Sequence, residues 1–231
     1  MTVKMIHSGK YLQCQTFAII GTDGVVIIDP GSGYFEDEVI FGLCETGATP
    51  EDVRAVLITH CHSDHAFNVD RWQSSGALLM ASSPTAKAMK DCAPLIWCEH
   101  TELITPVTID KVLADGEVID ICGMHITCVA TPGHTPGCMS YLLHDDTDII
   151  AFTGDMLMPG SQPGWAGVDF SGDALLDSLE RLQKYPINKV YPGHGTITGD
   201  INNWLENGIQ LGRAGKWQLN SVPTSYEVPE K

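Results

Sequence analysis

The sequence predicts an α+β fold in which mixed β-sheets carry helices on their outer faces. Near the N-terminus, two short apolar runs flank a turn of glycine, threonine and aspartate, a pattern typical of a β-hairpin. Later in the chain, apolar runs of strand length alternate with segments whose apolar residues recur at helical spacing. We find no long series of parallel strand-helix-strand units, which favours mixed sheets over a purely parallel one.

The expected elements follow from these patterns. Phe17–Ile20 and Val25–Ile28 form the hairpin, and the apolar residues of Phe35–Cys44 have the spacing of an amphipathic helix. Ser83 followed by Pro84 predicts the start of a further helix. The remaining strands are expected at Ala55–Ile58, Val118–Ile121, His125–Ala130, Met139–Leu143, Ile149–Phe152 and Val190–Tyr191, and the remaining helices at Leu175–Leu182 and Ile201–Leu211.

Composition predicts the domain organisation and the cellular environment. A chain of 231 residues, 43% of them hydrophobic, can bury one full core, so we expect a single domain over residues 1–215 and a C-terminal tail at residues 216–231. No segment has the roughly 20 consecutive apolar residues of a membrane span, and no apolar signal-peptide core follows the N-terminus. We therefore expect a cytoplasmic protein with no membrane partner. The eight cysteines form no CxxC pair and are expected to be free thiols.

The net charge of −16 bears on the partners of the protein. Such a charge repels polyphosphates over long range, so no nucleic-acid partner is expected and the substrate should be a small molecule. A homodimer is compatible with the sequence, although no residue identifies an interface.

A dense group of metal-ligating side chains directly follows the expected strand that ends at Ile58. His60 and His62 alternate with other residues in an extended segment, so their side chains point to the same side and can bind one ion together. Asp64 and His65 follow where the chain turns, and they can face a second ion. Imidazole and carboxylate groups at this density are typical ligands of zinc and other first-row metals.

Three more candidate ligands lie in short loops that also follow expected strands. They are His134 in the sequence TPGHTPG, Asp155 in TGD and His194 in YPGHG. If these strands share a direction, all the ligands gather at one edge of the sheets. Asp29 also ends a strand, and the sequence leaves open whether it caps a turn or orients a ligand histidine from behind.

Seven of these residues carry a resemblance to a known family. They are His60, His62, Asp64, His65, His134, Asp155 and His194. Their order and their Pro and Gly neighbours resemble the metal-binding signature of the metallo-β-lactamase superfamily, over about residues 12 to 200. The resemblance implies a four-layer αβ/βα sandwich and a metal-dependent hydrolase with two divalent ions. Zn²⁺ is the expected metal, and iron and manganese accept the same donors.

The resemblance also assigns a role to each ligand. One ion would be bound by His60, His62 and His134, and the other by Asp64, His65 and His194, with Asp155 as the bridge. Such a pair of ions lowers the pKa of a bridging water and polarises the scissile carbonyl or phosphoryl oxygen. The expected catalytic residues are therefore Asp155, which holds the pair together, and Asp64, which can help to move the proton.

The bridging aspartate distinguishes between branches of the superfamily. The true β-lactamases usually lack it, and some replace a ligand of the second ion by cysteine, whereas this chain keeps Asp155 and His65. The pattern is therefore more similar to glyoxalase II and to its lactonase and phosphodiesterase relatives. The expected function is a dinuclear hydrolase that uses a bridging hydroxide to cleave a small-molecule thioester, ester or lactone bond.

Two departures weaken more specific assignments. Only about 35 residues follow His194, where glyoxalase II carries an additional helical region and basic residues that hold glutathione. Quorum-quenching lactonases have a tyrosine shortly after the bridging aspartate, and positions 156–160 contain none. These departures argue against recognition of glutathione and against identity as a lactonase.

Three alternatives stay open. A persulfide dioxygenase would bind one iron through the counterparts of His60, His134 and Asp155, but Val168 stands where these enzymes carry an arginine. A phosphodiesterase or nuclease that acts on nucleic acid would need a basic surface, against which the net charge of −16 argues. A non-enzymatic metal-binding protein would fill the coordination shell, whereas three ligands per ion and a shared carboxylate leave room for water and substrate.

Residues 156–173 form a loop, rich in glycine and proline, that we expect to be the wall of the substrate site. Its two aromatic residues, Trp165 and Phe170, are the candidate substrate contacts. Packing beneath the loop is the alternative for both.

Overall fold

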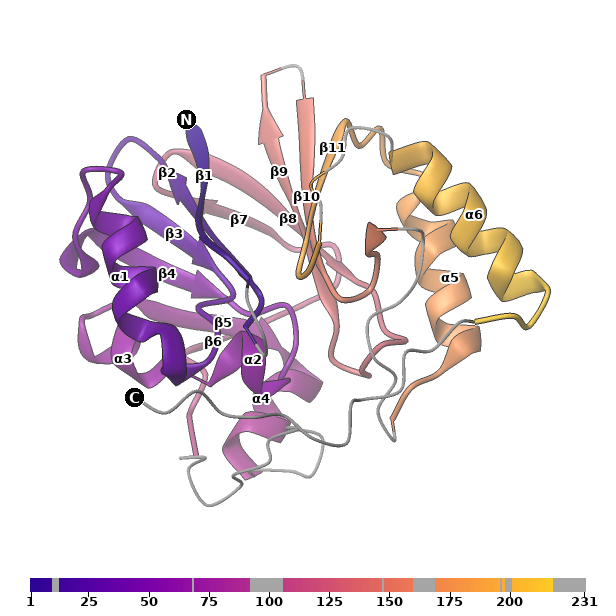
Figure 1. Cartoon of the computed structure of the whole chain (residues 1–231), viewed down its shortest axis with the longest axis horizontal. Helices are drawn as coiled ribbons and strands as arrows, with labels where there is room; N and C mark the ends of the chain where they lie inside the picture. Colours follow the sequence, from indigo (N-terminus) through magenta and orange to yellow (C-terminus); the bar gives the residue numbers. More distant parts are fainter. Residues whose placement is uncertain are drawn as a thin grey trace.

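The computed structural model describes residues 1–9, 13–67, 69–91, 106–146, 148–159, 169–195, 197 and 201–217. Two β-sheets pack face to face, and helices cover the outer face of each sheet (Figure 1). The expected α+β fold with layers of helix, sheet, sheet and helix is thereby confirmed. Among the described residues, we find no helix with the length and apolar character needed to cross a membrane.

The N-terminal sheet has six strands that lie side by side in chain order. They are β1 (Thr2–Ser8), β2 (Gln15–Ile20), β3 (Val25–Ile28), β4 (Val53–Leu57), β5 (Leu78–Ser82) and β6 (Lys111–Leu113). The pairs β1-β2 and β2-β3 are antiparallel, which confirms the expected hairpin, and β3 to β6 are parallel. The expectation that no long parallel series occurs is therefore wrong. It fails because β5 and β6 are short strands without a clear period, which sequence patterns do not separate from loops.

Helices connect the parallel strands and cover the outer face of this sheet (Figure 1). They are α1 (Glu36–Cys44), α2 (Ser63–Ala66), α3 (Val69–Ser74) and α4 (Ser83–Asp91), together with the 3₁₀ turns η1 (Gly33–Phe35) and η2 (Pro50–Asp52). The first turn of α1 contains three acidic residues, which interact favourably with the positive end of the helix dipole. The expected helices at Phe35–Cys44 and after Ser83 are both present.

The C-terminal sheet has five strands in the order β11-β10-β9-β8-β7. They are β7 (Val118–Ile121), β8 (Met124–Ala130), β9 (Met139–Asp145), β10 (Asp148–Gly154) and β11 (Lys189–Pro192). Strand β9 is antiparallel to both β8 and β10, and β10 is parallel to β11, so β8, β10 and β11 run in one direction. Helices α5 (Gly172–Leu182) and α6 (Ile201–Arg213) cover the outer face (Figure 1).

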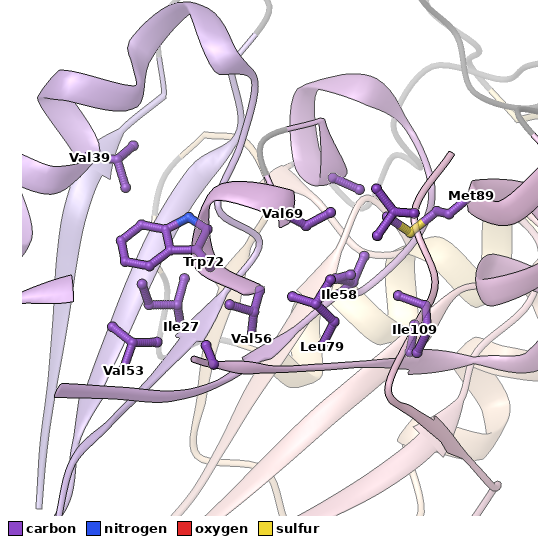
Figure 2. Packing of buried hydrophobic residues seen from close by; sticks show 14 of the residues in the cluster. Ile27, Val39, Val53, Val56, Ile58, Val69, Trp72, Leu79, Met89 and Ile109 are labelled. Atoms are coloured by element: carbon purple, nitrogen blue, oxygen red, sulfur yellow. The ribbon is translucent and has the colours of Figure 1, made fainter. Parts of the chain in front are cut away.

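Both faces of the central strands are buried, which explains their continuous apolar sequences. In β3, Ile27 packs into the outer core beneath the helices, while Val26 and Ile28 pack into the core between the two sheets. This alternation is the period of two that a pleated strand imposes. In the outer core, Trp72 of α3 lies between Val39 of α1 and the strands (Figure 2).

We predict that Trp72→Ala destabilises the protein by about 3–5 kcal/mol, because the fully buried indole would leave a cavity that the sheet cannot close. The measurement is chemical denaturation of the metal-free protein. Phe41→Ala is the control, since Phe41 of α1 is 66% exposed and its loss should change stability by no more than about 0.5 kcal/mol. Equal effects of the two substitutions would contradict the packing described above.

Candidate metal centre

The strands deliver the candidate ligands to one edge of the sandwich. His60 and His62 lie in the extended segment that follows β4, and His62 is the N-cap of α2, so the next residues turn into that helix. From the other sheet, His134 follows β8, Asp155 follows β10 and His194 follows β11. The common direction of these three strands explains why their C-terminal loops meet the loop after β4.

Among the described residues, three groups of three side chains have ligand atoms close enough to share one ion. The first consists of His60, His62 and His134 and the second of Asp64, His65 and His194, and the third, His60, His65 and Asp155, shares a histidine with each of them. In each group, the ligand atoms lie within 4.8 Å of one another. The His62 Nδ1 and His134 Nε2 atoms are 3.0 Å apart, and the His194 Nε2 and Asp64 Oδ2 atoms are also 3.0 Å apart. The structure thus places the members of each expected ligand set close to one another.

Asp155 lies between the two groups. One carboxylate oxygen is 3.3 Å from His65 Nε2, and the other is 3.7 Å from His134 Nε2 and 3.6 Å from His194 Nε2. The carboxylate therefore faces one imidazole of the first group and two of the second. This is the position from which a single carboxylate could contact two ions.

Buried polar atoms without a hydrogen-bond partner show that the residues fit a metal. They include His60 Nε2, His65 Nε2 and Asp155 Oδ1. A buried polar atom without a partner costs free energy, and native proteins rarely tolerate several in one place. A cation between these atoms would satisfy them, and nitrogen and oxygen donors in such groups are suited to a first-row metal.

Burial and neighbouring charges shift the pKa values of the candidate ligands in different directions. Burial lowers the pKa of His134 to about 3 and that of His60 well below its ordinary value, so both imidazoles are neutral at pH 7. Burial alone would raise the pKa of Asp155, but the His194 and His65 imidazoles outweigh it and hold this pKa well below its ordinary value. Burial would lower the pKa of His65 and of His194, but anionic neighbours that include Asp155 raise both values above the ordinary one. Because neutral imidazoles and ionised carboxylates are the forms that bind a cation, an ion bound by His65 and His194 would displace their protons.

Asp29 fixes the orientation of His65. Its carboxylate accepts hydrogen bonds from the Thr59 backbone N–H at 2.7 Å and from Thr59 Oγ1 at 2.6 Å, and it lies 2.8 Å from His65 Nδ1. Because an ionised carboxylate only accepts hydrogen bonds, the proton of the imidazole is held on Nδ1 and Nε2 is left free to bind a metal. Of the two roles that the sequence leaves open for Asp29, the structure supports the orienting one.

The Asp29 backbone adopts φ +49°, which suits a short polar side chain better than most other residues. At Gly193 the requirement is space rather than dihedral angle. A Cβ atom there would lie 2.3 Å from Asp155 Oδ1 and 2.6 Å from His65 Cε1. The glycine before His194 is therefore needed for the loop to approach the other ligands.

The structure describes one of the two predicted substrate contacts. Trp165 lies outside the described residues. Phe170 is half-buried and packs against the apolar cluster beneath α5 and α6. Its role as a substrate contact stays a prediction.

Sequence patterns did not identify three other residues of this region. Thr59 binds Asp29, as described above, and Cys14 donates its backbone N–H to the Asp64 carbonyl oxygen at 3.2 Å. Gln15 hydrogen-bonds the loop that carries His194. No motif marks the last two, because the apolar run of the hairpin begins only at Phe17.

Comparison with known proteins identifies the family. The sequence pattern of the Metallo-beta-lactamase superfamily matches residues 9–194, most of the chain. The chain belongs to this superfamily. The matched region contains every candidate ligand. A metallo-beta-lactamase family protein from Thermus thermophilus has the same fold, with a TM-score of 0.74 and 21% identity over 92% of this chain and 79% of that protein.

Several enzymes are similar in sequence to this chain. Glyoxylase B2 of Dictyostelium discoideum is 31% identical over 172 residues, 68% of this chain and 54% of the relative. A hydroxyacylglutathione hydrolase of Haemophilus influenzae is 30% identical over 185 residues, 74% of this chain and 80% of the relative. An acyl-coenzyme A thioesterase of Gallus gallus is 26% identical over 170 residues, 66% of this chain and 60% of the relative. The chain spans less than two thirds of the length of two of these relatives. The similarity to the glyoxylase and to the hydroxyacylglutathione hydrolase confirms the glyoxalase II-like resemblance.

We predict that Asp29→Asn weakens metal binding by about 10-fold to 100-fold, because the amide cannot accept all three hydrogen bonds and no longer holds the His65 proton on Nδ1. Asparagine tolerates the same backbone conformation, so the main-chain geometry should survive. The measurement is competition with a chromophoric chelator.

Asp110→Asn is the matched control for this prediction. Asp110 accepts a hydrogen bond from the Leu79 backbone N–H at 2.9 Å and one from Gln73, so its loss should lower stability without a change in metal affinity. Equal metal affinities of the Asp29→Asn and wild-type proteins would show that Asp29 has only a structural role.

Proposed function

We propose that this protein is a dinuclear metal-dependent hydrolase that cleaves a small-molecule thioester. The observation that carries the proposal is the position of Asp155 between two groups of three ligands, with unpartnered buried atoms facing one another. Zn²⁺ is the metal we expect, although iron and manganese suit the same donors. When bound, the ions supply Lewis acidity and lower the pKa of a water molecule toward neutrality.

The residues of the chain would divide the work of the reaction. His60, His62 and His134 would hold one ion, and Asp64, His65 and His194 the other. Asp155 would keep the two ions at a fixed separation because its carboxylate faces both groups. The seven side chains are packed into place before substrate arrives, so little reorganisation is needed during the reaction.

Asp64 is the candidate for moving the proton. Its side chain is 17% exposed, whereas those of His65 and Asp155 are 0% and 8% exposed, so it lies closer to solvent than either. Its carboxylate is 3.0 Å from His194 Nε2, and this imidazole helps to keep the Asp64 pKa below its ordinary value despite burial. An ionised carboxylate at this place can accept the proton of the attacking water and pass it to the leaving group.

The thioester specificity rests on the relatives and on the ligand set. A hydroxyacylglutathione hydrolase and an acyl-coenzyme A thioesterase are both similar in sequence to this chain. The retained Asp155 and His65 also favour a glyoxalase II-like enzyme over a true β-lactamase. Esters and lactones present a similar carbonyl group to the centre and are the next substrates to test.

The experiment that tests the function is metal analysis of protein purified without added metal, followed by turnover of thioester, lactone and phosphodiester substrates on the same sample. We expect two ions per chain and thioester hydrolysis that a chelator abolishes and added Zn²⁺ restores. One iron per chain with oxygen uptake on a persulfide would instead identify a dioxygenase. Two firmly bound ions with no turnover of any substrate would favour a non-enzymatic metal-binding protein.

We predict that Asp155→Ala lowers kcat for the thioester by at least about a hundredfold, because the two ions would lose the carboxylate that fixes their separation. Steady-state kinetics at saturating metal measure the effect. Asp148→Ala is the control, since Asp148 lies exposed at the other end of the same strand and should leave kcat unchanged. Near-normal hydrolysis by the Asp155→Ala protein would rule out the two-ion mechanism.

A further inference from the structure

Cys14 and Gln15, at the start of β2, connect two segments that carry ligands of the same proposed ion. The Cys14 backbone N–H donates to the Asp64 carbonyl oxygen at 3.2 Å, and the Gln15 backbone N–H donates to the Gly193 carbonyl oxygen at 2.7 Å. Two adjacent residues thus bond to α2, which follows β4, and to the loop after β11. The strands β4 and β11 belong to different sheets of the sandwich.

The Gln15 side chain adds a second bond on the far side of His194. Its Nε2 donates to the Gly195 carbonyl oxygen at 2.5 Å, so the main chain and the side chain of one residue bracket the histidine. Gln15 is only 6% exposed, so the donor of this part-buried hydrogen bond has little access to water. Its Oε1 is buried without a partner, and this cost is tolerated while Nε2 holds the loop.

His194 is the candidate ligand that most needs such support. Its side chain is 28% exposed, whereas those of His65 and His134 are fully buried. Packing alone therefore constrains it less than the other imidazoles. The Gly193 N–H also donates to the Gly154 carbonyl oxygen at 2.9 Å, which fixes the loop before His194 but not after it.

We propose that Gln15 is a positioning residue of the metal centre, which holds His194 opposite Asp64. It thereby sets the affinity for the second ion, the one that Asp64, His65 and His194 would bind. The inference rests on the proposed two-ion function and adds a residue that the metal-binding signature does not include. Gln15 touches neither ion nor substrate. It acts through the Gly193 and Gly195 carbonyl oxygens on either side of the ligand.

The test is the affinity of the metal-free protein for two equivalents of Zn²⁺, measured by chelator competition. Gln15→Met removes the donor at nearly constant side-chain length. It should lower the affinity for the second ion by about tenfold, while the affinity for the first ion stays within twofold of wild type. Gln15→Glu should weaken it further, since a carboxylate would face the Gly195 carbonyl oxygen. It also serves as the second variant if the methionine protein does not fold.

Ser178→Ala is the matched control. Ser178 Oγ donates to the Pro132 carbonyl oxygen at 2.6 Å, so this substitution also removes one hydrogen bond from a side chain to the backbone near a ligand, His134. It should leave the affinity for the second ion unchanged. A merely structural role of Gln15 would lower the melting temperature of the metal-free protein and leave both affinities unaltered.

The outcomes separate this inference from the proposed function. Wild-type protein with two ions and a Gln15→Met protein whose two affinities are unchanged would overturn the role of Gln15 alone. Wild-type protein that binds a single ion would overturn the two-ion function, and the role of Gln15 with it. A selective loss of affinity for the second ion in both Gln15 variants, but not in Ser178→Ala, would establish the role.

Discussion

The buried carboxylate of Asp155 is the constraint on which the rest of the site depends. Its oxygens lie among imidazoles of both ligand groups, and one of them has no hydrogen-bond partner. An ionised group in this position is stable only if positive charge is close to it. The neighbouring imidazoles supply part of that charge, and a bound cation would supply more. The glycine at Gly193, which permits the close approach of the last loop, serves the same requirement.

Much of the fold could be predicted because its strands are punctuated by turns and its helices have clear apolar faces. The hairpin of β2 and β3 and the strands β7 to β10 fall within a few residues of their expected positions. The strands β1, β5 and β6 were not predicted. Strand β1 alternates weakly and lies at the edge of its sheet, and β6 has only three residues, so neither carries a period that the sequence alone can reveal.

The candidate ligands could be predicted from the sequence because histidine and aspartate in Pro- and Gly-rich loops form a local pattern. The residues that support them could not. Asp29 orients His65 from 36 positions away, and the Gln15 side chain reaches Gly195 across 180 positions. Such contacts arise from the pairing of strands and the meeting of two sheets, which leave no periodic trace in either segment. Their discovery requires coordinates.

The ligands of each proposed ion come from both sheets. His60 and His62 follow a strand of the N-terminal sheet and His134 one of the C-terminal sheet; the second group is divided in the same way between Asp64 with His65 and His194. Neither half of the sandwich can therefore complete a coordination site alone. Bound metal would cross-link the two halves, and its binding free energy would add to the stability of the folded state. Without metal, the cohesion of the two halves would depend mainly on the apolar core between the sheets.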